Sequence, residues 1–519
     1  MRNRLVLAAL SAVLLILSFP GFNFEFLAWV AFVPLFFAVE NKEPFKAFLI
    51  SYAAGVLFFL GTIYWLIHVT LPGMIVVVLY LGLYFGIFGM ACSYYFQRSH
   101  LSLMAIPCAW VTLELVRSHL LTGFGWNLLA YSQSYTLPIV QIADIFGLYG
   151  VSFLVMLVNT AIFFTLKNIK KRERSFIYIS IAVFLVYLSV SYGVFRLKNI
   201  FTGRSIKVAV IQGNIPQERK WDASFREFIL NRYDELTRKA AEEKPDIIVW
   251  PETSVPGFLE TEEDLLKSIK ALVAGVNTPL LAGAVREEPA DTGVNYYNSA
   301  VLFSRDGNVL GRYDKIHLVP FGEYIPFKGI LKFVEKFAPV PIGDCAAGKE
   351  YSVFNFFVER NSKGKDSSWK LVKKVRFSTL ICFEDIFPDI SRRFVMNGAD
   401  FLVNITNDAW YKKTSAAEQH AQASIFRAVE NRINVIRAAN TGVSCFINQK
   451  GEVLGRVELL GEDVFVSGFK TGEIILTKTR TFYTVYGDLF AYLCLVVTVG
   501  SVFIRKRKMP CSKQVLKVK

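Results

Sequence analysis

The first 200 residues contain one long apolar run after another, and this pattern limits what the chain can fold into more than any other feature. A helix that crosses the roughly 30 Å hydrocarbon core of a bilayer needs about 20 residues at 1.5 Å each. We predict seven such helices, and an eighth near the C-terminus. They are expected at residues 4–20, 24–39, 46–68, 73–96, 101–121, 148–166, 176–196 and 486–504. The first resembles a signal peptide, but Phe19-Pro20-Gly21-Phe22 is no small-residue cleavage site, so we expect it to be retained.

The overall composition agrees with a membrane protein. Hydrophobic residues make up 53% of the 519 residues, aromatic residues 15% and charged residues 19%. Soluble domains carry about 25% charged residues, so disordered, collagen-like and simple soluble enzymes are poor fits. Lys and Arg outnumber Asp and Glu by 58 to 43, a net charge of +15. In a membrane protein such an excess usually marks cytoplasmic loops rather than a nucleic-acid partner.

The basic residues near the predicted helices lie in alternate loops. If eight helices alternate in direction, these loops share one side, which the positive-inside rule makes cytoplasmic. The opposite loops at 69–72 and 118–147 contain no Lys or Arg. We therefore predict that both termini are cytoplasmic, that the domain between them faces outward, and that no nucleic acid binds. The basic residues concerned are Arg2, Arg4, Lys42, Lys46, Arg98, Lys167, Lys170, Lys171, Arg172, Arg174 and the cluster at 505–508.

The loop at residues 117–147 is long, nearly uncharged and rich in aromatic residues, so we expect it at the headgroup interface. Just before it, Glu114 and Arg117 are three residues apart and share one face of a helix. Ionisable residues at a membrane boundary are costly and often functional. The alternative is that the pair neutralises itself and fixes the helix end. The sequence favours neither interpretation.

Between residues 201 and 480, charged residues occur throughout and the apolar runs have the length of strands. Strand and helix patterns alternate, with hairpin turns at Asp306-Gly307 and Lys450-Gly451. This alternation predicts an α/β domain with layered sheets and helices outside them. Strands are predicted at 207–212, 246–250, 279–284, 299–303, 376–381, 401–405 and 443–448, and helices at 223–243, 262–275, 390–397 and 416–437.

Several familiar catalytic patterns are missing from the sequence. The five His residues show no paired metal-ligand spacing, and neither a GxSxG nor a Walker motif occurs, so we predict no metal and no cofactor. The seven Cys residues are scattered without a CxxC pair, which excludes a disulfide scaffold or a zinc ribbon. Cys345 and Cys445 are interpreted as structural or incidental thiols, and a disulfide between them stays open.

Three residues in the outward domain are candidates for joint chemistry. Glu252 follows a strand in DIIVWPE, Lys315 lies in RYDKIHLVPFGEYIP, and Cys382 closes a strand in RFSTLICFEDIFP. Each alone has a plainer interpretation, as a turn residue, a surface lysine and a buried structural thiol. Together, a carboxylate accepts the proton of a thiol, and an ammonium group stabilises the oxyanion formed on the attacked carbonyl. The set therefore predicts covalent thiol catalysis.

These motifs, in this order, resemble the carbon–nitrogen hydrolase (nitrilase) superfamily. With the membrane helices and the GFGW segment at 123–126, the whole chain resembles the apolipoprotein N-acyltransferase family. Further matches are QGNIPQ at 212–217, KW at 220–221, NITNDAW at 404–410 and ANTG at 439–442. The resemblance implies a polytopic α-helical membrane domain plus an α/β nitrilase-like domain, an αββα layered sandwich. The expected units are residues 1–200, 201–480 and 481–519, the last with the eighth helix and a basic tail.

The resemblance also implies roles for particular residues. Glu252 would be the general base toward Cys382 and then the acid toward the leaving alcohol, Lys315 would stabilise the oxyanion, and Glu323 would support the site. Other residues are expected to support the site, or to form mobile, substrate-gating surroundings. They are Glu384, Trp221, Phe383, Trp126 and Asn298.

The implied reaction is a two-step acyl transfer at the outer face of the cytoplasmic (inner) membrane. Cys382 would take the acyl chain of a phospholipid as a thioester, and the N-terminal amine of a diacylated apolipoprotein would then accept it, with ping-pong kinetics. We expect a monomer in the bilayer. The second hypothesis is a membrane-tethered amidase that hydrolyses an extracytoplasmic amide with the same three residues. A transporter or receptor is less favoured, because the predicted helices contain few ionisable residues.

Overall fold

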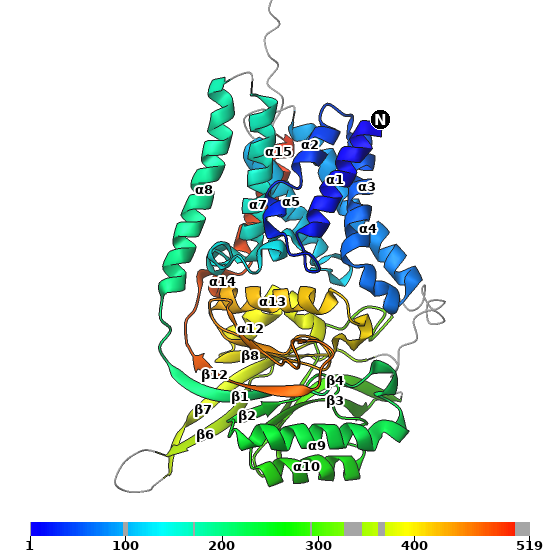
Figure 1. Ribbon diagram of the computed structural model, residues 1–519, viewed down its shortest axis with the longest axis vertical. Coiled ribbons are helices and arrows are strands. Elements are labelled where there is room, and N and C mark those ends of the chain that lie inside the picture. The colour runs from blue at the N-terminus through cyan, green and yellow to red at the C-terminus, as the bar shows by residue number, and fades with distance from the viewer. Residues whose placement is uncertain are drawn as a thin grey trace, which may run out of the picture.

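Long apolar helices and short buried strands separate into two regions of the molecule, one above the other in Figure 1. The computed structural model describes residues 2–96, 102–169, 172–290, 293–325, 345–361 and 369–503. The upper region is helical, and the lower region is an α/β domain. The chain passes from the helical region into the α/β domain after α8 and returns through α14 and α15.

The helical region contains the apolar runs of the sequence. Within the described residues, four helices are long and apolar enough to cross a membrane: α3, α4, α7 and the Phe176–Lys198 part of α8. The prediction of eight crossings remains a prediction, since the other apolar helices are shorter. The helices are α1 (Arg2–Leu17), α2 (Val33–Val39), α3 (Pro44–Thr62), α4 (Leu71–Tyr95), α5 (Ser102–Arg117), α6 (Leu137–Val140), α7 (Ala143–Lys167), α8 (Arg172–Lys198), α14 (Phe482–Tyr486) and α15 (Leu489–Phe503).

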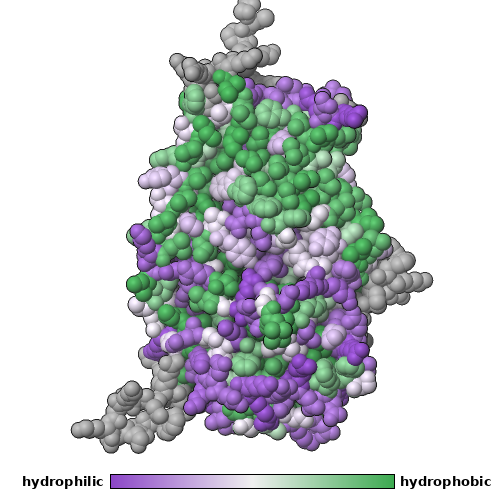
Figure 2. All heavy atoms as spheres, in the orientation of Figure 1, coloured by the Kyte–Doolittle hydropathy of each residue, from purple (hydrophilic) through white to green (hydrophobic). Residues whose placement is uncertain are grey.

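The surface of the helical region is apolar, and Figure 2 shows it as a broad hydrophobic band above a more hydrophilic lower region. On α8, Tyr187 is 65% and Phe195 63% exposed. Apolar surface of this extent is typical of a membrane domain, where lipid covers it. In the span predicted at 24–39, the chain forms a 3₁₀ turn at Glu25–Trp29 before α2 begins at Val33.

Several predicted loop cations gather at the end of the helices farthest from the α/β domain (Figure 1). Arg4 Nη1 donates to the main-chain oxygen of Glu40 at 2.9 Å, and Lys167 Nζ lies 2.8 Å from Glu40 Oε1. The start of α1, the end of α7 and the connection after α2 therefore lie close together, while the side of the membrane that they face stays a prediction. Arg98, Lys170, Lys171 and the cluster at 505–508 lie outside the described residues.

The α/β domain is an αββα sandwich of two six-stranded mixed sheets. The first sheet has the order β12-β1-β2-β3-β4-β5 and the second β11-β10-β9-β8-β7-β6. All seven predicted strands are present. The strands are β1 (Arg204–Gln212), β2 (Ile247–Val249), β3 (Leu280–Pro289), β4 (Val294–Phe303), β5 (Val309–Asp314), β6 (Phe354–Asn361), β7 (Trp369–Ile381), β8 (Phe401–Thr406), β9 (Val435–Ala439), β10 (Cys445–Ile447), β11 (Val453–Arg456) and β12 (Gly468–Leu476).

Helices cover the outer face of each sheet (Figure 1). Helices α9 (Arg226–Glu242) and α10 (Glu263–Val276) pack on the first sheet, and α12 (Pro388–Met396) and α13 (Ala416–Asn431) on the second. Ile229, Tyr233 and Leu236 recur every three or four residues on α9, so one face of that helix is buried. The centre of each sheet is parallel, and β2, β8 and β9 are buried throughout because both faces are covered.

Helix α13 is shorter than the sequence pattern predicted. It ends at Asn431, and Arg432 adopts a left-handed conformation (φ 49°) that stops it. Residues Val435–Ala439 then form the buried strand β9 between β8 and β10. The pattern at 432–437 did not reveal the strand, because so short a segment, buried on both faces, shows no period that separates a strand from a helix.

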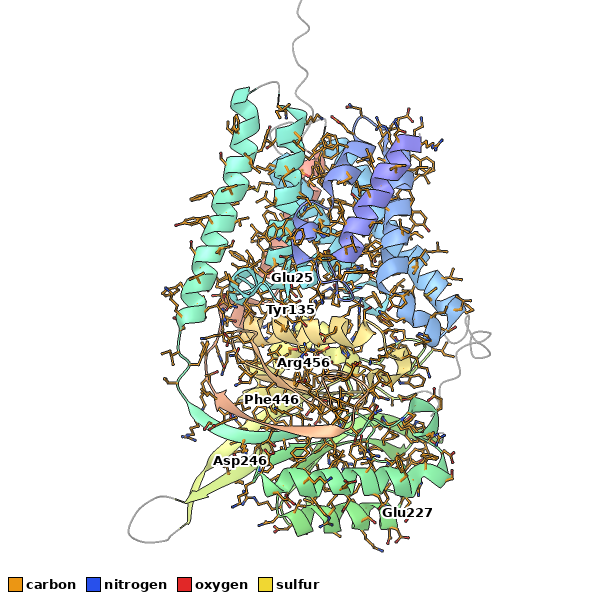
Figure 3. The ribbon with its side chains drawn as sticks, in the orientation of Figure 1. Glu25, Tyr135, Glu227, Asp246, Phe446 and Arg456 are labelled. Carbon is orange, nitrogen blue, oxygen red and sulfur yellow. The ribbon has the colours of Figure 1, made fainter. Side chains whose placement is uncertain are left out.

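The segment at residues 117–147 is largely buried between the helical region and the α/β domain, and its expected position at the headgroup interface stays a prediction. Trp126 and Tyr131 are each 2% exposed, and Tyr131 packs edge-on against Phe426 of α13. Figure 3 shows Tyr135 at the level where the two regions meet, and its hydroxyl donates to Glu418 of α13 at 2.9 Å. The apolar character of the segment therefore comes from burial between the two regions.

Glu114 and Arg117 secure this segment. Glu114 Oε1 accepts from the main-chain N–H of Leu129 at 2.7 Å, and Arg117 Nη2 donates to the main-chain oxygen of Asn127 at 3.4 Å. Both side chains are buried. These contacts join the end of α5 to the segment, and both side chains also line a mainly aromatic cavity in the helical region.

Candidate active site

Cys382 stands at the point where the central strand β7 ends and a 3₁₀ turn, η8 (Cys382–Ile386), begins. Its φ of 53° lies in the left-handed region, which a residue with a side chain adopts at a cost. Such strain persists only where the surroundings over-determine it, and it often marks a functional residue. The turn places Cys382 in the wall of a cavity of about 220 Å³.

The same cavity brings most of the predicted site residues together. Its wall includes Trp221, Glu252, Asn298, Lys315, Glu323 and Cys382. These residues lie up to 161 positions apart in the chain. Phe383, Glu384 and Trp126 are not among the residues that line it. The rest of the wall is mainly apolar or aromatic, with Val285, Phe321, Trp410 and Tyr411.

Lys315 and its carboxylates form a compact buried cluster. Lys315 Nζ lies 2.9 Å from Glu323 Oε2 and 3.7 Å from Glu252 Oε1. Asn298 Nδ2 donates to both carboxylates, at 2.7 Å to Glu252 Oε1 and 2.8 Å to Glu323 Oε1. Asn298 was expected beside the substrate, and it also orients the two carboxylates relative to the ammonium group.

Burial and charge set the protonation of this cluster. Burial lowers the pKa of Lys315, but the carboxylates of Glu323 and Glu252 outweigh it and raise that pKa above its usual value. Burial, with the nearby Glu252 carboxylate, raises the pKa of the Cys382 thiol well above 9, and Lys315 offsets only part of this. At neutral pH the site therefore holds a neutral thiol beside a permanent cation.

Glu384 lies beneath the cavity and connects the turn at Cys382 to the loop of Lys315. Its Oε1 accepts from Tyr313 Oη at 2.8 Å and from the main-chain N–H groups of Ile316 and His317 at 2.7 and 3.1 Å. Its Oε2 accepts from the N–H of Ile381 at 2.7 Å. Glu384 is fully buried and does not line the cavity, and its contacts join the two segments that carry Cys382 and Lys315.

The sequence predicts no role for Lys220, although the KW pair at 220–221 is one of the matches to the family. Lys220 is 3% exposed, and its Nζ donates to the main-chain oxygen of Glu252 at 2.9 Å. Burial lowers the pKa of Lys220 to about 8. The contact fixes the loop that carries Trp221 to the strand end that carries Glu252. The sequence feature that could have indicated Lys220 is its position next to an aromatic residue in a loop that contains proline.

The helical region reaches the site directly. Val69, which ends the 3₁₀ turn Tyr64–His68 just before α4, lines the cavity. Gln419 of α13 accepts hydrogen bonds on Oε1 from the indole N–H of Trp65 at 3.0 Å and of Trp126 at 2.9 Å. Trp126 stacks on Phe383 with ring centroids 6.2 Å apart, and Trp65 packs on Tyr411 at 4.4 Å.

Two further expectations concern metals and disulfides. Among the described residues, no group of three His, Cys, Asp or Glu side chains is placed to hold a metal ion. No disulfide joins Cys345 to Cys445. Cys445 is buried in β10, whereas Cys345 lines the same cavity as Cys382, a position that its sequence surroundings did not indicate.

Comparison with known proteins assigns both regions. The model of the apolipoprotein N-acyltransferase N-terminal domain matches residues 11–161, and the carbon–nitrogen hydrolase model matches residues 207–478. An apolipoprotein N-acyltransferase of Geobacter metallireducens is 39% identical over 97% of this chain and 96% of its own. Another, of Chlorobaculum tepidum, is 31% identical over 94% of each chain. A nitrilase-superfamily amidase of Nesterenkonia AN1 has a TM-score of 0.36 at 17% identity, over 56% of this chain and 95% of its own.

Proposed function

Since the chain belongs to the apolipoprotein N-acyltransferase family, and so is a membrane enzyme that N-acylates lipoproteins, we propose that it works through a thioester on Cys382. The acyl donor is a membrane phospholipid, and the acceptor is the N-terminal amine of a diacylglyceryl-cysteine. One observation carries this proposal: a single cavity is lined by a thiol, two carboxylates and a lysine of the α/β domain together with Val69 of the helical region.

The first half-reaction begins with the neutral thiol. Glu252 takes the proton of Cys382, and the thiolate attacks the ester carbonyl of the phospholipid. Negative charge develops on the carbonyl oxygen, where the ammonium group of Lys315 stabilises it. When the C–O bond breaks, Glu252 returns the proton to the departing glycerol oxygen. The products are a thioester and a lysophospholipid.

The second half-reaction uses the same groups. The neutral amine of the acceptor attacks the thioester carbonyl, and Lys315 again stabilises the oxyanion. Glu252 takes a proton from the attacking nitrogen, the C–S bond breaks, and the proton passes to the sulfur of Cys382. The product is an amide, and the enzyme returns to its starting state. Because the two substrates alternate at one thiol, the kinetics are ping-pong.

The burial of the thiol supports a general base. A thiol whose pKa is raised well above 9 is almost wholly protonated at neutral pH, and only the thiolate is an effective nucleophile. The 3.7 Å contact between Lys315 Nζ and Glu252 Oε1 keeps the carboxylate beside the cation that serves the oxyanion. Glu323 and Asn298 hold this pair in place.

Contact with the helical region favours the transferase over a tethered amidase. A tether needs one helix and no contact with the site, whereas here Val69 lines the cavity and Trp126 stacks on the residue that follows Cys382. Each acyl chain costs about 0.8 kcal/mol per CH₂ to withdraw from the bilayer, so a site that acts on lipids gains by remaining at the membrane. We place the α/β domain on the periplasmic face of the cytoplasmic membrane and both termini in the cytoplasm. The loops with Arg4 and Lys167, which share the far end of the helices, support this topology.

The test is mass spectrometry of the full-length protein in nanodiscs that contain phospholipid. We expect one acyl adduct, located on Cys382 by peptide mapping, and its disappearance when a diacylated lipopeptide is added, with formation of N-acylated peptide. Release of free fatty acid without N-acylated peptide would support hydrolysis instead. An adduct on another residue would refute the assignment of the nucleophile.

A further inference from the structure

A histidine that the mechanism does not use lies directly behind the nucleophile. His420, on α13, is 1% exposed. Its Nε2 lies 3.2 Å from the main-chain oxygen of Cys382 and 3.0 Å from Asp385 Oδ1. On the other side of the ring, Nδ1 lies 2.8 Å from Asp408 Oδ1. The imidazole is therefore held between two buried carboxylates and touches the main chain of Cys382.

The contacts fix the protonation state of this ring. A carbonyl oxygen and an ionised carboxylate only accept hydrogen bonds, and each ring nitrogen of His420 faces such groups. A neutral imidazole has one N–H and a bare nitrogen, whereas the imidazolium ion has two donors. His420 is therefore an imidazolium. Burial lowers its pKa, but Asp385 and Asp408 outweigh burial and raise the pKa to about 9.

Charge balance supports the same assignment. The two carboxylates face one other cation, because Arg437 Nη1 lies 2.6 Å from Asp385 Oδ2 and its Nη2 lies 3.9 Å from Asp408 Oδ2. All four side chains are at most 1% exposed. Two buried anions beside a single cation would leave one charge uncompensated, which is strongly unfavourable. With His420 protonated, the cluster is neutral.

His420, Asp385, Asp408 and Arg437 lie around the turn η8 (Cys382–Ile386), which we call the nucleophile turn. The main-chain oxygen of Cys382 faces His420 Nε2 and also accepts from Asn404 Nδ2 at 3.1 Å. These two donors hold the peptide group that follows a residue with φ 53°. From the other side, the indole of Trp126 lies 5.2 Å from the His420 ring, close enough for a cation–π contact.

We propose that His420 is a positioning residue for the nucleophile: clamped as an imidazolium by Asp385 and Asp408, it holds the main-chain carbonyl of Cys382 so that the thiol faces Glu252 and Lys315. The inference rests on the proposed function for the identity of the nucleophile. It extends that function to a second group of residues, which contacts no substrate. Because Trp126 belongs to the helical region and lies beside His420, the helical region also helps to hold the turn at Cys382.

The test compares three variants of the full-length protein in phospholipid nanodiscs. His420→Gln removes the cation, and His420→Gln/Asp385→Asn removes one cation and one anion, so the remaining pair of Asp408 and Arg437 stays neutral. Glu430→Gln is the matched control, because it removes a fully buried charge from the same helix at a carboxylate paired with Arg427. Thermal unfolding reports stability. The rate of Cys382 acylation and its alkylation by iodoacetamide, both located by peptide mass spectrometry, report the position of the thiol.

We expect His420→Gln to slow acylation by roughly 10- to 100-fold at saturating phospholipid with little change in KM, the range that a misplaced reacting group typically costs. The double variant should regain thermal stability but not the acylation or alkylation rate. Glu430→Gln should lose stability and keep both rates. Parental acylation and alkylation rates in the double variant would refute the proposal, because the cluster would then serve folding alone. If the parent forms no acyl adduct, the proposed function fails, while the alkylation rates still test the positioning of Cys382.

Discussion

The buried carboxylate of Glu384 offers a sharp test of how the site is held together. It receives four hydrogen bonds, from Tyr313 Oη and the N–H groups of Ile316 and His317 on one oxygen and from the N–H of Ile381 on the other. Glu384→Gln replaces one acceptor oxygen by an NH₂ group. In the better orientation of the amide, the three donors keep their oxygen, and the N–H of Ile381 then faces another donor.

A buried donor left without an acceptor costs about 1–3 kcal/mol. At about 2–4 °C per kcal/mol for a domain of this size class, the melting temperature should fall by about 2–12 °C. The lost bond is the one that fixes the residue before Cys382, so acylation should also slow by about 10- to 100-fold.

Two measurements check this prediction. Thermal unfolding of the protein in detergent gives the stability change, and quenched-flow mass spectrometry gives the rate at which the Cys382 adduct appears. Glu235→Gln is the control, because that side chain forms an exposed i,i+4 pair with Lys239, and such pairs contribute about 0.3–0.5 kcal/mol. If Glu384→Gln melts and acylates like Glu235→Gln, then Glu384 does not connect the nucleophile turn to the Lys315 loop, and our account of the site is wrong.

Three other outcomes follow from the same geometry. Cys382→Ala should form no acyl adduct with phospholipid, and an undiminished adduct by intact-mass measurement would exclude this thiol as the nucleophile. Lys315→Met should lower the rate of acylation in a single turnover by roughly 10²–10³-fold, the cost of losing one oxyanion donor. A loss of less than about fivefold would exclude Lys315 as the group that stabilises the oxyanion. The pKa of His420 is raised to about 9, and it faces Asp385, Asp408, Arg437 and the main chain of Cys382. Its protonated form therefore stabilises the fold fully below about pH 6.5, its usual pKa, and that contribution disappears as the pH rises through about 9. The melting temperature should fall over this range in the parent and fall less in His420→Gln/Asp385→Asn; equal slopes would contradict the assignment.

Much of the α/β domain could be predicted from sequence, because its strands are short apolar runs between clear turn signals. All seven predicted strands formed, and Glu252, Lys315 and Cys382 met at one cavity as the chain order suggested. The strand β9 was missed for a physical reason. A run of five buried residues has no period that separates strand from helix, and the preceding α13 hides the boundary at Arg432.

The supporting residues were harder to predict than the residues that line the cavity. His420 and Lys220 have no local pattern that marks them, since their partners lie on other strands and turns. Asp408 and Arg437 approach His420 only when β8, β9 and α13 come together, and Glu252 approaches Lys220 only across the first sheet. Tertiary structure therefore determines these contacts, and a sequence read in order does not contain them.

The burial of the segment at 117–147 could not be predicted from its composition either. Its aromatic and uncharged composition suits the headgroup interface and the inside of a protein equally well. The structure shows burial against α13, through contacts such as the edge-on packing of Tyr131 against Phe426 of that helix. Composition reports that a segment avoids water but not which surface covers it.

Helix α13 is where the chemistry and the membrane meet. One face of it contacts the second sheet, and the opposite face contacts the helical region, so a single turn of the helix carries contacts to both. Gln419 accepts from two tryptophans of the helical region, and its neighbour His420 touches the nucleophile turn. A shift of the helical region against α13 would therefore move Gln419 and His420 together, and Cys382 with them. In a tethered amidase nothing would favour this coupling, because the position of the membrane would not matter to the reaction. In an enzyme whose two substrates both arrive through the lipid, the coupling keeps the thiol at a fixed position relative to the membrane surface from which the substrates come.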